Sequence, residues 1–284
     1  MYPPKFDYYR ANSVEEALAL LQEHDGKLLA GGHSLLPIMK LRLADPGVLI
    51  DIGRIESLQG LSPANGHTRI GALTTHAMVA ASNALPDVLV EAAGWIGDPQ
   101  VRNRGTVGGN IAHADPASDL PTVLAALDAV VEVQGPNGSR EVNAADFFVD
   151  LFMTDLQPNE IVTGVRAPGD GQGTGSAFAK LFNPASRYAM VNAAAVLTMD
   201  GDRCTEAKVA VGGLTPSAMR APSVEEALQG RTLDEKALAE AAEAVHDDLP
   251  GDLLGDIHAS ADYRRKVAPT FVRRALLKAM ERAG

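Results

Sequence analysis

Cysteine is nearly absent from this chain, because Cys204 is the only thiol among its 284 residues. One cysteine cannot form an intrachain disulfide, a Cys-x-x-Cys redox pair, a structural zinc site or an iron–sulfur cluster. Basic residues are outnumbered, with 25 Lys+Arg against 36 Asp+Glu and a net charge of −11. This acidity argues against nucleic acid or an anionic membrane as the main partner.

Long apolar runs and the common catalytic or nucleotide-binding motifs are also missing. The longest weakly polar stretch, Ala189–Met199, is far shorter than the ~20 residues that span a bilayer. The amino terminus has no apolar core of an export signal. We therefore expect no transmembrane segment and a cytoplasmic location. The patterns GxGxxG, GxxxxGK(S/T), HExxH and GxSxG do not occur, which argues against a Rossmann site or a P-loop.

The composition is that of an ordinary globular protein, with 46% hydrophobic and 21% charged residues. A chain of 284 residues is long for a single core, so two domains are expected. The most glycine-rich segment, 169–175, is the best candidate for the linker between them.

Local patterns predict both helices and strands. Ser13 and Glu16 form a capping box that predicts a helix start. The residues expected on the buried face of that helix are Val14, Ala17, Leu18 and Leu21. Runs bounded by turn residues predict strands at 27–30, 48–52, 68–75, 130–134, 140–142, 160–166, 189–199 and 204–211. The turn Gly135-Pro136-Asn137-Gly138 predicts a hairpin between 130–134 and 140–142, because Asn-Gly tolerates the positive φ angles of a tight turn. Further helices are predicted at about 75–84, 234–246 and 261–283.

A glycine pair follows the first strand, in the segment Leu29-Ala30-Gly31-Gly32-His33-Ser34-Leu35. Adjacent glycines let successive backbone amides converge on one point, which suits an anion such as a pyrophosphate. Ser34 adds a hydroxyl donor. Taken alone, the segment fits an ordinary strand-to-loop turn at least as well, and His33 alone fits a surface or hydrogen-bonded histidine.

A second glycine-centred segment contains Thr106-Val107-Gly108-Gly109-Asn110. Its glycines allow close backbone approach. Thr106 and Asn110 offer side-chain hydrogen bonds, and Asp119 offers an acceptor for a ribose hydroxyl. The occurrence of both segments in one chain favours two loops that grip one dinucleotide.

The chain resembles the flavin-binding medium subunits of molybdenum hydroxylases, above all the carbon monoxide dehydrogenase medium-subunit group. The xanthine dehydrogenase flavin domain is a more distant relative. Four motifs carry the resemblance: AGGHSLLPIMKLRLA (30–44), IGALTTH (70–76), VRNRGTVGGNIAHADPASDLP (101–121) and VGGLTPSAMRAP (211–222). They span both expected domains, so the resemblance covers essentially the whole chain.

The resemblance implies an α+β fold. A two-lobed FAD-binding domain of the PCMH type is expected over 1–172, with lobes of about 1–55 and 56–172. A smaller C-terminal domain of antiparallel sheet plus helices is expected over 176–284. The implied cofactor is FAD, and no metal site is expected in this chain.

The resemblance also implies which residues bind the FAD. The first motif matches the pyrophosphate-binding loop, and Asp119 matches a position that contacts the ribose region. Ile96, after Trp95, matches a position that lines the flavin or adenine site. Lys180 matches a basic residue near the isoalloxazine. The full implied set is Leu29, Ala30, Gly31, Gly32, His33, Ser34, Leu35, Ile96, Thr106, Val107, Gly108, Gly109, Asn110, Asp119, Val162, Lys180 and Tyr188.

Tyr188 matches an aromatic that covers one face of the isoalloxazine in the carbon monoxide dehydrogenase group. The chain departs from the usual pattern just before it. Relatives often have basic residues and an Asp there, whereas this chain has Asn183-Pro184-Ala185-Ser186-Arg187. A core or edge tyrosine is the alternative interpretation of Tyr188.

The implied function is electron transfer within a heteromeric enzyme. Electrons would arrive from an iron–sulfur subunit and leave through FAD to a quinone, NAD or oxygen. The implied partners are a molybdopterin-containing large subunit and a small subunit with 2Fe-2S clusters, assembled as a dimer of heterotrimers. Substrate oxidation would occur in another subunit, so no general acid or base is expected in this chain.

Two other functions are open at this stage. Gly31-Gly32-His33 is similar to loops that tether flavin through a histidine in self-sufficient FAD-dependent oxidases. The short C-terminal domain and the aromatic content of 5% argue against that function. A scaffold that has lost its cofactor is disfavoured because both glycine segments are intact.

Overall fold

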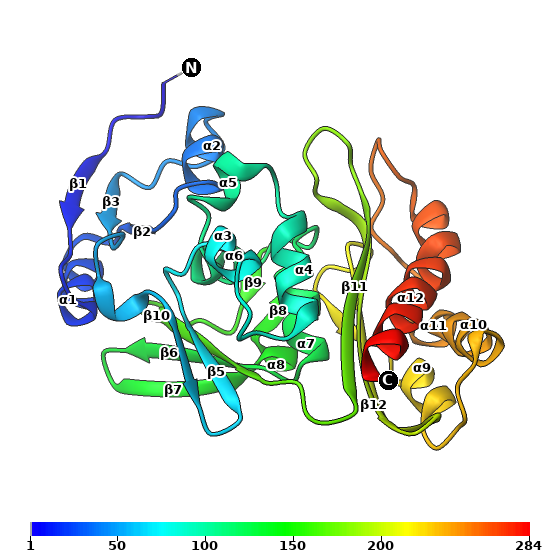
Figure 1. The fold of residues 1–284 in the computed structure, drawn as a ribbon. Coiled ribbons are helices and arrows are strands. Elements are labelled where there is room, and N and C mark those ends of the chain that lie inside the picture. The colour runs from blue at the N-terminus through cyan, green and yellow to red at the C-terminus, as the bar shows by residue number, and fades with distance from the viewer. Residues whose placement is uncertain (1) are drawn as a thin grey trace.

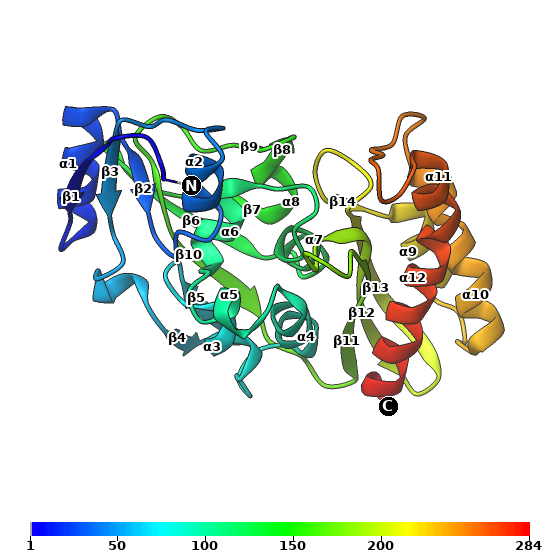
Figure 2. The ribbon, with the colours of Figure 1, turned by 90° about the horizontal axis from the view of Figure 1, so that it is seen from above.

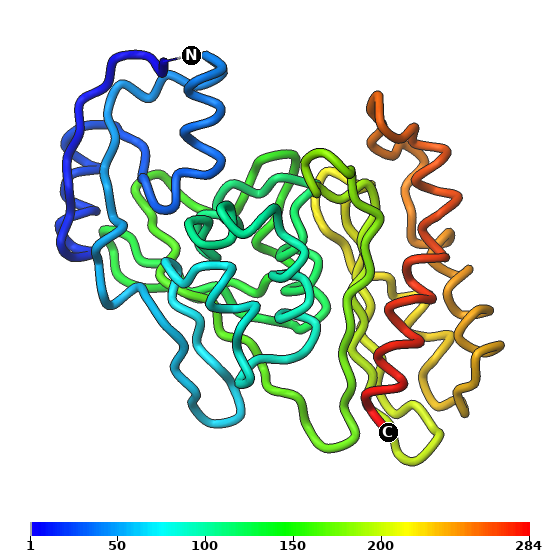
Figure 3. Tube along the Cα trace, turned by 45° about the horizontal axis from the view of Figure 1, so that its top comes forward, coloured from blue at the N-terminus to red at the C-terminus, as the bar shows by residue number. Residues whose placement is uncertain are grey.

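The computed structural model describes residues 2–284. The chain forms three parts that follow one another in sequence and in space: an N-terminal lobe, a central lobe and a C-terminal part (Figure 1). A view from a tilted direction shows the same succession, with the C-terminal helix on the outer side of the last sheet (Figure 3).

The N-terminal lobe is a three-stranded parallel sheet of order β1-β3-β2. The strand predicted to be buried at 27–30 is an edge strand with exposed Lys27, so that part of the prediction was wrong. The elements are β1 (Asp7–Arg10), α1 (Val14–His24), β2 (Lys27–Leu29), α2 (Leu35–Lys40) and β3 (Val48–Asp51).

Helix α1 begins where the capping box predicted. The Ser13 hydroxyl accepts a hydrogen bond from the Glu16 amide at 3.1 Å, and the Glu16 carboxylate accepts from the Asn12 amide at 2.7 Å. The four residues predicted for its inner face are all buried: Val14, Ala17, Leu18 and Leu21. The local pattern was sufficient here because the helix packs one continuous apolar face on the sheet.

The central lobe is a five-stranded antiparallel sheet of order β4-β5-β10-β6-β7. Its strands are β4 (Leu61–Ala64), β5 (His67–Gly71), β6 (Val130–Gly135), β7 (Gly138–Asn143) and β10 (Ile161–Pro168). The predicted hairpin between β6 and β7 is confirmed, with Gly135 and Gly138 as the last pair and Gly138 at φ 113°.

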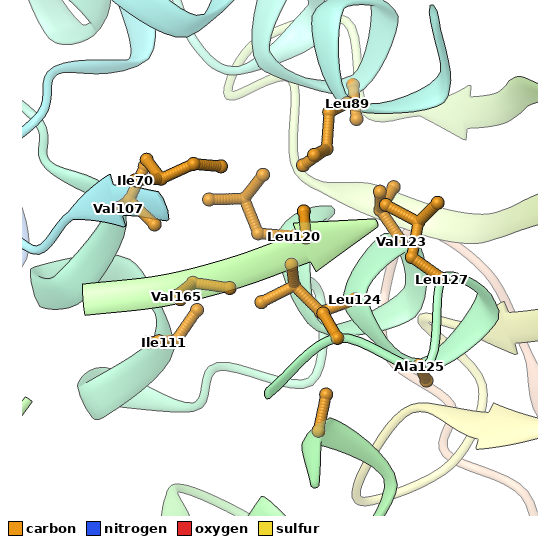
Figure 4. Close-up of a cluster of buried hydrophobic side chains, with 14 of the residues drawn as sticks. Ile70, Leu89, Val107, Ile111, Leu120, Val123, Leu124, Ala125, Leu127 and Val165 are labelled. Carbon is orange, nitrogen blue, oxygen red and sulfur yellow. The ribbon is translucent and has the colours of Figure 1, made fainter. Parts of the chain in front are cut away.

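Short helices and one small hairpin complete the central lobe. They are η1 (Glu56–Leu58), α3 (His76–Ala80), α4 (Asp87–Trp95), α5 (Pro99–Arg102), α6 (Val107–His113), α7 (Leu120–Ala126), α8 (Ala144–Phe147), β8 (Phe148–Asp150) and β9 (Met153–Thr154). The main core lies where Leu89 of α4, Ile111 of α6 and Leu124 of α7 meet Ile70 and Val165 of the sheet (Figure 4).

The C-terminal part is an antiparallel sheet of order β11-β12-β13-β14 with four helices. The elements are β11 (Thr174–Phe182), β12 (Ala189–Asp200), β13 (Arg203–Gly212), β14 (Met219–Arg220), α9 (Pro222–Leu228), α10 (Glu235–Glu243), α11 (Val245–Asp248) and α12 (Ala261–Ala283). Helix α12 runs along one face of the sheet (Figure 2).

Both faces of this last sheet are buried. Ala193 and Ala195 belong to the core shared with α12, whereas Ala194 between them belongs to the core of the central lobe. A strand buried on both faces has a continuous apolar sequence instead of alternation. This explains the weakly polar run at Ala189–Met199. Among residues 2–284, no helix is both long and apolar enough to cross a membrane.

Candidate functional site: a cradle of two glycine segments

The first glycine segment connects β2 to α2. Gly32 has φ +72°, a conformation that glycine adopts without strain, and the Leu36 amide donates to the Gly32 carbonyl at 3.1 Å. Within the described chain, the backbone amides of Gly31, Gly32, His33 and Ser34 donate to no protein acceptor. These amides are therefore available to an anionic ligand.

The second segment is the start of a helix and not the loop that the sequence predicted. Thr106 caps α6, and its hydroxyl accepts from the Gly109 amide at 3.2 Å. The Val107 amide donates to the Thr74 carbonyl and the Gly108 amide to the Ala72 carbonyl. Gly108 is needed for packing, because a Cβ there would lie 2.5 Å from the Ala72 Cβ. These amides are already satisfied, so the first segment supplies the free donors.

The two segments are in direct contact, and together they form the glycine cradle (29–35 and 104–110). A Cβ at Gly31 would lie 2.0 Å from the Arg104 carbonyl oxygen, and a Cβ at Gly109 would lie 3.8 Å from the Ala30 Cβ. The structure therefore brings together two motifs that are about 75 residues apart in the sequence.

His76 lies next to the second cradle segment, and it is not among the residues predicted for the site. Its ring packs on Gly105, where a Cβ would lie 2.8 Å from the imidazole. The side chain is 3% exposed, and its Nδ1 has no partner. The pKa of His76 is lowered to about 4, mainly by burial and also by the nearby His33 and Arg102. The signal in the sequence was its place at the end of the IGALTTH motif.

Asp119 and Lys180 form a buried ion pair beside the cradle. Their side chains are 3% and 2% exposed, and the Lys180 Nζ lies 2.5 Å from the Asp119 Oδ2. Burial raises the pKa of Asp119 above its ordinary value, although Lys180 and Asn192 act against that shift. Lys180 was predicted to lie near the isoalloxazine, and that place stays a prediction. In the structure its charge is paired with Asp119.

Tyr188 faces the cradle from the loop between β11 and β12. Burial and the carboxylates of Asp115 and Asp119 raise the pKa of its hydroxyl, and a hydrogen bond with Ser34 opposes the shift. The ring is 44% exposed, so it is neither a core residue nor fully solvated. A half-exposed aromatic ring beside a free-amide loop is suited to stacking on a planar ligand.

The remaining predicted residues, Ile96 and Val162, lie in different surroundings. Ile96 ends α4, where Arg102 Nη1 donates to the Ile96 carbonyl at 3.1 Å and holds the turn. Trp95 packs on Phe182 with ring centroids 5.4 Å apart, which places this turn beside the end of β11. Val162 is 5% exposed within the core of the central lobe, in the same buried cluster as Val107 of the second cradle segment.

A cavity of about 850 Å³ lies elsewhere, between the start of α1 and the five-stranded sheet. Two of its three arginines have carboxylate partners, since Arg69 pairs with Glu132 at 2.6 Å and Arg140 with Asp155 at 2.5 Å, whereas the third, Arg54, is exposed. Unlike the cradle, it has no run of adjacent glycines. Among residues 2–284, no cluster of three or more metal-ligating side chains is present.

Comparisons with known protein families match both halves of the chain. Residues 4–170 match the FAD-binding domain in molybdopterin dehydrogenase, and residues 176–279 match the CO dehydrogenase flavoprotein C-terminal domain. The α+β fold and the FAD-binding domain expected from the sequence are therefore confirmed.

Individual relatives match along nearly the whole chain. The carbon monoxide dehydrogenase medium chain of Hydrogenophaga pseudoflava is 41% identical over 99% of both chains. Subunit alpha of the 6-hydroxypseudooxynicotine dehydrogenase complex of Paenarthrobacter nicotinovorans is 40% identical, over 100% of this chain and 97% of that one. A solved structure of the Hydrogenophaga pseudoflava carbon monoxide dehydrogenase that lacks the Mo-pyranopterin moiety superposes with a TM-score of 0.95 over 100% of both chains.

Proposed function

Because the chain belongs to the family of FAD-binding medium subunits of molybdenum hydroxylases, we propose that it uses bound FAD to relay electrons from an iron–sulfur partner subunit to an external acceptor. The chain is an FAD-binding oxidoreductase subunit of the carbon monoxide dehydrogenase type. Bound flavin supplies the redox chemistry, and the residues of this chain bind, orient and shield it.

We place the FAD pyrophosphate on the first glycine segment. The observation that carries this placement is the set of free amides at Gly31–Ser34, held against the Arg104–Gly105 backbone. The half-exposed Tyr188 ring is suited to cover the isoalloxazine, and the proposal includes the other residues implied by the resemblance. We keep 1–172 and 176–284 as the proposed domains, because the segment between β10 and β11 is rich in glycine.

We propose that the partners are a molybdopterin-containing large subunit and a small subunit with 2Fe-2S clusters, in a cytoplasmic dimer of heterotrimers. Quinone, NAD and oxygen are the candidate acceptors. The β8–β9 hairpin supports assembly with other subunits, because it exposes four large apolar side chains: Val149, Leu151, Phe152 and Met153.

The self-sufficient oxidase is no longer favoured. Two relatives that match along nearly the whole chain are named as a complex subunit and as the medium chain of a dehydrogenase. His33 is exposed, and its Nδ1 lies 2.9 Å from the Gly31 carbonyl oxygen. This contact gives the His33 side chain a structural role in the loop that needs no covalent bond to flavin.

The test is the visible spectrum of the purified chain, before and after acid precipitation. Flavin absorption that moves into the supernatant is the expected result, since it shows a noncovalent cofactor. Absorption that stays in the pellet would instead indicate a covalent flavin. A colourless protein that takes up no added FAD would refute the proposal. Gel filtration of the chain co-expressed with its partner subunits tests the assembly separately.

A further inference from the structure

A buried polar network crosses the boundary between the central lobe and the C-terminal sheet. Asp119 and Thr122 lie at the start of α7, and Lys180 and Asn192 lie on β11 and β12. All four side chains are buried. Buried polar groups are costly unless each has a partner, so this arrangement constrains both domains.

Asn192 occupies the centre of the network. Its Nδ2 donates to the Ser118 carbonyl oxygen and to Asp119 Oδ1, both at 3.1 Å. Its Oδ1 accepts from the Thr122 hydroxyl at 2.8 Å. Gly212 closes the site from β13, because a Cβ there would lie 2.7 Å from the Asn192 Oδ1. Both amide hydrogens of Asn192 are therefore used, and the orientation of its side chain is fixed.

Asp119 does not perform the role that its position in the helix would give it. It is the N-cap residue of α7, yet its side chain accepts no amide hydrogen from that helix. An aspartate at this position ordinarily caps the first turn. Here Asn192 holds one carboxylate oxygen and Lys180 holds the other.

The network also reaches the glycine cradle. The Ser118 hydroxyl donates to the Asn110 Oδ1 at 2.7 Å, and the Ser118 carbonyl is one of the two acceptors that Asn192 holds. Asn110 lies in the second cradle segment. Asn192 is therefore linked to the cradle through Ser118, and it contacts the buried ion pair directly.

We infer that Asn192 is a positioning residue for the flavin site: it fixes Asp119 against Lys180 and so holds the pair electrically neutral next to the cradle. This inference rests on the proposed function. Without Asn192, the Asp119 carboxylate would lose one of its two side-chain donors and take up a proton more readily. The Lys180 ammonium would then be uncompensated beside the cofactor.

Other charged or titratable groups also face this pair. Tyr188 and Asp115 lie on the cradle side, and the Asp119 carboxylate raises the pKa of the Tyr188 hydroxyl. Besides Lys180, the side-chain partner of Asp119 is the neutral Asn192 on β12. A change in the net charge of the Asp119–Lys180 pair therefore changes the electrostatic potential at the cradle.

The experiment compares the full chain with its Asn192→Leu and Thr122→Val variants. Flavin fluorescence gives the dissociation constant for FAD, redox titration gives the midpoint potential of the bound flavin, and thermal unfolding of the FAD-free chain gives stability. For Asn192→Leu we expect FAD binding that is weaker by about tenfold, because Ser118, which contacts Asn110 of the cradle, is no longer fixed by Asn192. We also expect a higher midpoint potential, because of the uncompensated ammonium.

The matched control is Ser176→Ala. The Ser176 hydroxyl is fully buried at the same domain boundary and accepts from the Val88 amide at 3.3 Å, away from Asp119. This variant should lower the unfolding temperature and leave the dissociation constant and the potential unchanged. Asn192→Leu would overturn the inference if it behaved in the same way.

Thr122 provides a second test in case Asn192→Leu does not fold. Thr122→Val keeps the shape of the side chain but removes the hydroxyl that orients Asn192, and it should raise the midpoint potential less than Asn192→Leu does. Thr122→Ser keeps the hydroxyl and should restore the wild-type potential. Equal midpoint potentials in the wild type, Thr122→Val and Thr122→Ser would overturn the inference. A wild-type chain that binds no FAD would overturn the proposed function instead.

Discussion

At the scale of single residues, the absence of a side chain at Gly31 allows the two cradle segments to contact each other. The Arg104 carbonyl oxygen occupies the place where a Cβ would be, at 2.0 Å. Backbone atoms cannot move aside as the end of a flexible side chain can. The close approach of the two segments therefore requires glycine at this position.

Gly31→Ala should separate the two cradle segments and weaken FAD binding by at least about tenfold, through the loss of aligned amide donors. Titration with FAD, followed by flavin fluorescence, measures this. Gly94→Ala is the control, because Gly94 lies in α4 and a Cβ added there would have no neighbour within 4 Å. That control should bind FAD normally, and equal affinities of all three proteins would contradict the role of Gly31.

His76 predicts a dependence of stability on pH. Its pKa is lowered from 6.5 to about 4 in the folded chain, so the unfolded chain binds the proton more tightly. The stability that the chain has with His76 neutral is complete above about pH 6.5 and is lost as the pH falls toward 4. Protonation of His76 in the unfolded chain alone would cost the folded chain about 3 kcal/mol. His76→Leu does not titrate, so urea unfolding between pH 7 and pH 4.5 should show a smaller loss of stability than in the wild type.

At the scale of elements, α6 shows how a short helix escapes detection in the sequence. The segment Val107–His113 has two glycines in its first turn and ends at an alanine in the left-handed conformation, so its helix propensity is low. Gly108 is required because the helix packs tightly on Ala72, and a Cβ at Gly109 would lie 2.8 Å from the Thr106 hydroxyl. The sequence shows that these residues are glycines, but it does not show the neighbouring atoms that leave no room for a side chain.

Thr106→Ala should lower the free energy of unfolding of the FAD-free chain by about 1 kcal/mol, because the Gly109 amide loses its capping acceptor. It should also weaken FAD binding, since the second cradle segment begins at this cap. Thr106→Ser keeps the hydroxyl and should resemble the wild type in both urea unfolding and FAD titration. If Thr106→Ala and Thr106→Ser gave the same result, the cap would have no such role.

Elements with strong local patterns could be predicted, and others could not. The capping box predicted α1 with its inner face, and the glycine-rich turn predicted the β6–β7 hairpin. The place of β10 in the middle of its sheet depends on partners from both sides, β5 and β6, which no local pattern shows. The same holds within the site: Asn192 and Thr122 are 70 residues apart and meet only through tertiary packing.

At the scale of the whole molecule, the C-terminal sheet is the element that joins the domains. One of its faces packs on α12 and the other on α4 and α7. The cradle belongs to the first two parts of the chain, whereas Lys180 and Tyr188 come from the third. The candidate site is therefore complete only when the domains are docked.

A charged cluster at Glu91 stabilises this docking away from the cradle. The Glu91 carboxylate of α4 accepts from Arg282 at 2.7 Å, from Lys278, and from the Phe178 amide of β11 at 3.0 Å. Burial alone would raise the pKa of Glu91, but these hydrogen bonds lower it below its ordinary value of 4.5. The stabilisation is therefore complete above about pH 4.5 and is lost as the pH falls further.

Glu91→Ala should lower the free energy of unfolding at pH 7 by about 2 kcal/mol, because it leaves the Arg282 and Lys278 charges and the Phe178 amide without this acceptor. The difference from the wild type should shrink below pH 4.5, where the wild-type carboxyl takes up a proton. Urea unfolding at pH 7 and pH 3.5 measures both values. A difference that stays constant with pH would show that the charge of Glu91 does not hold the domains together.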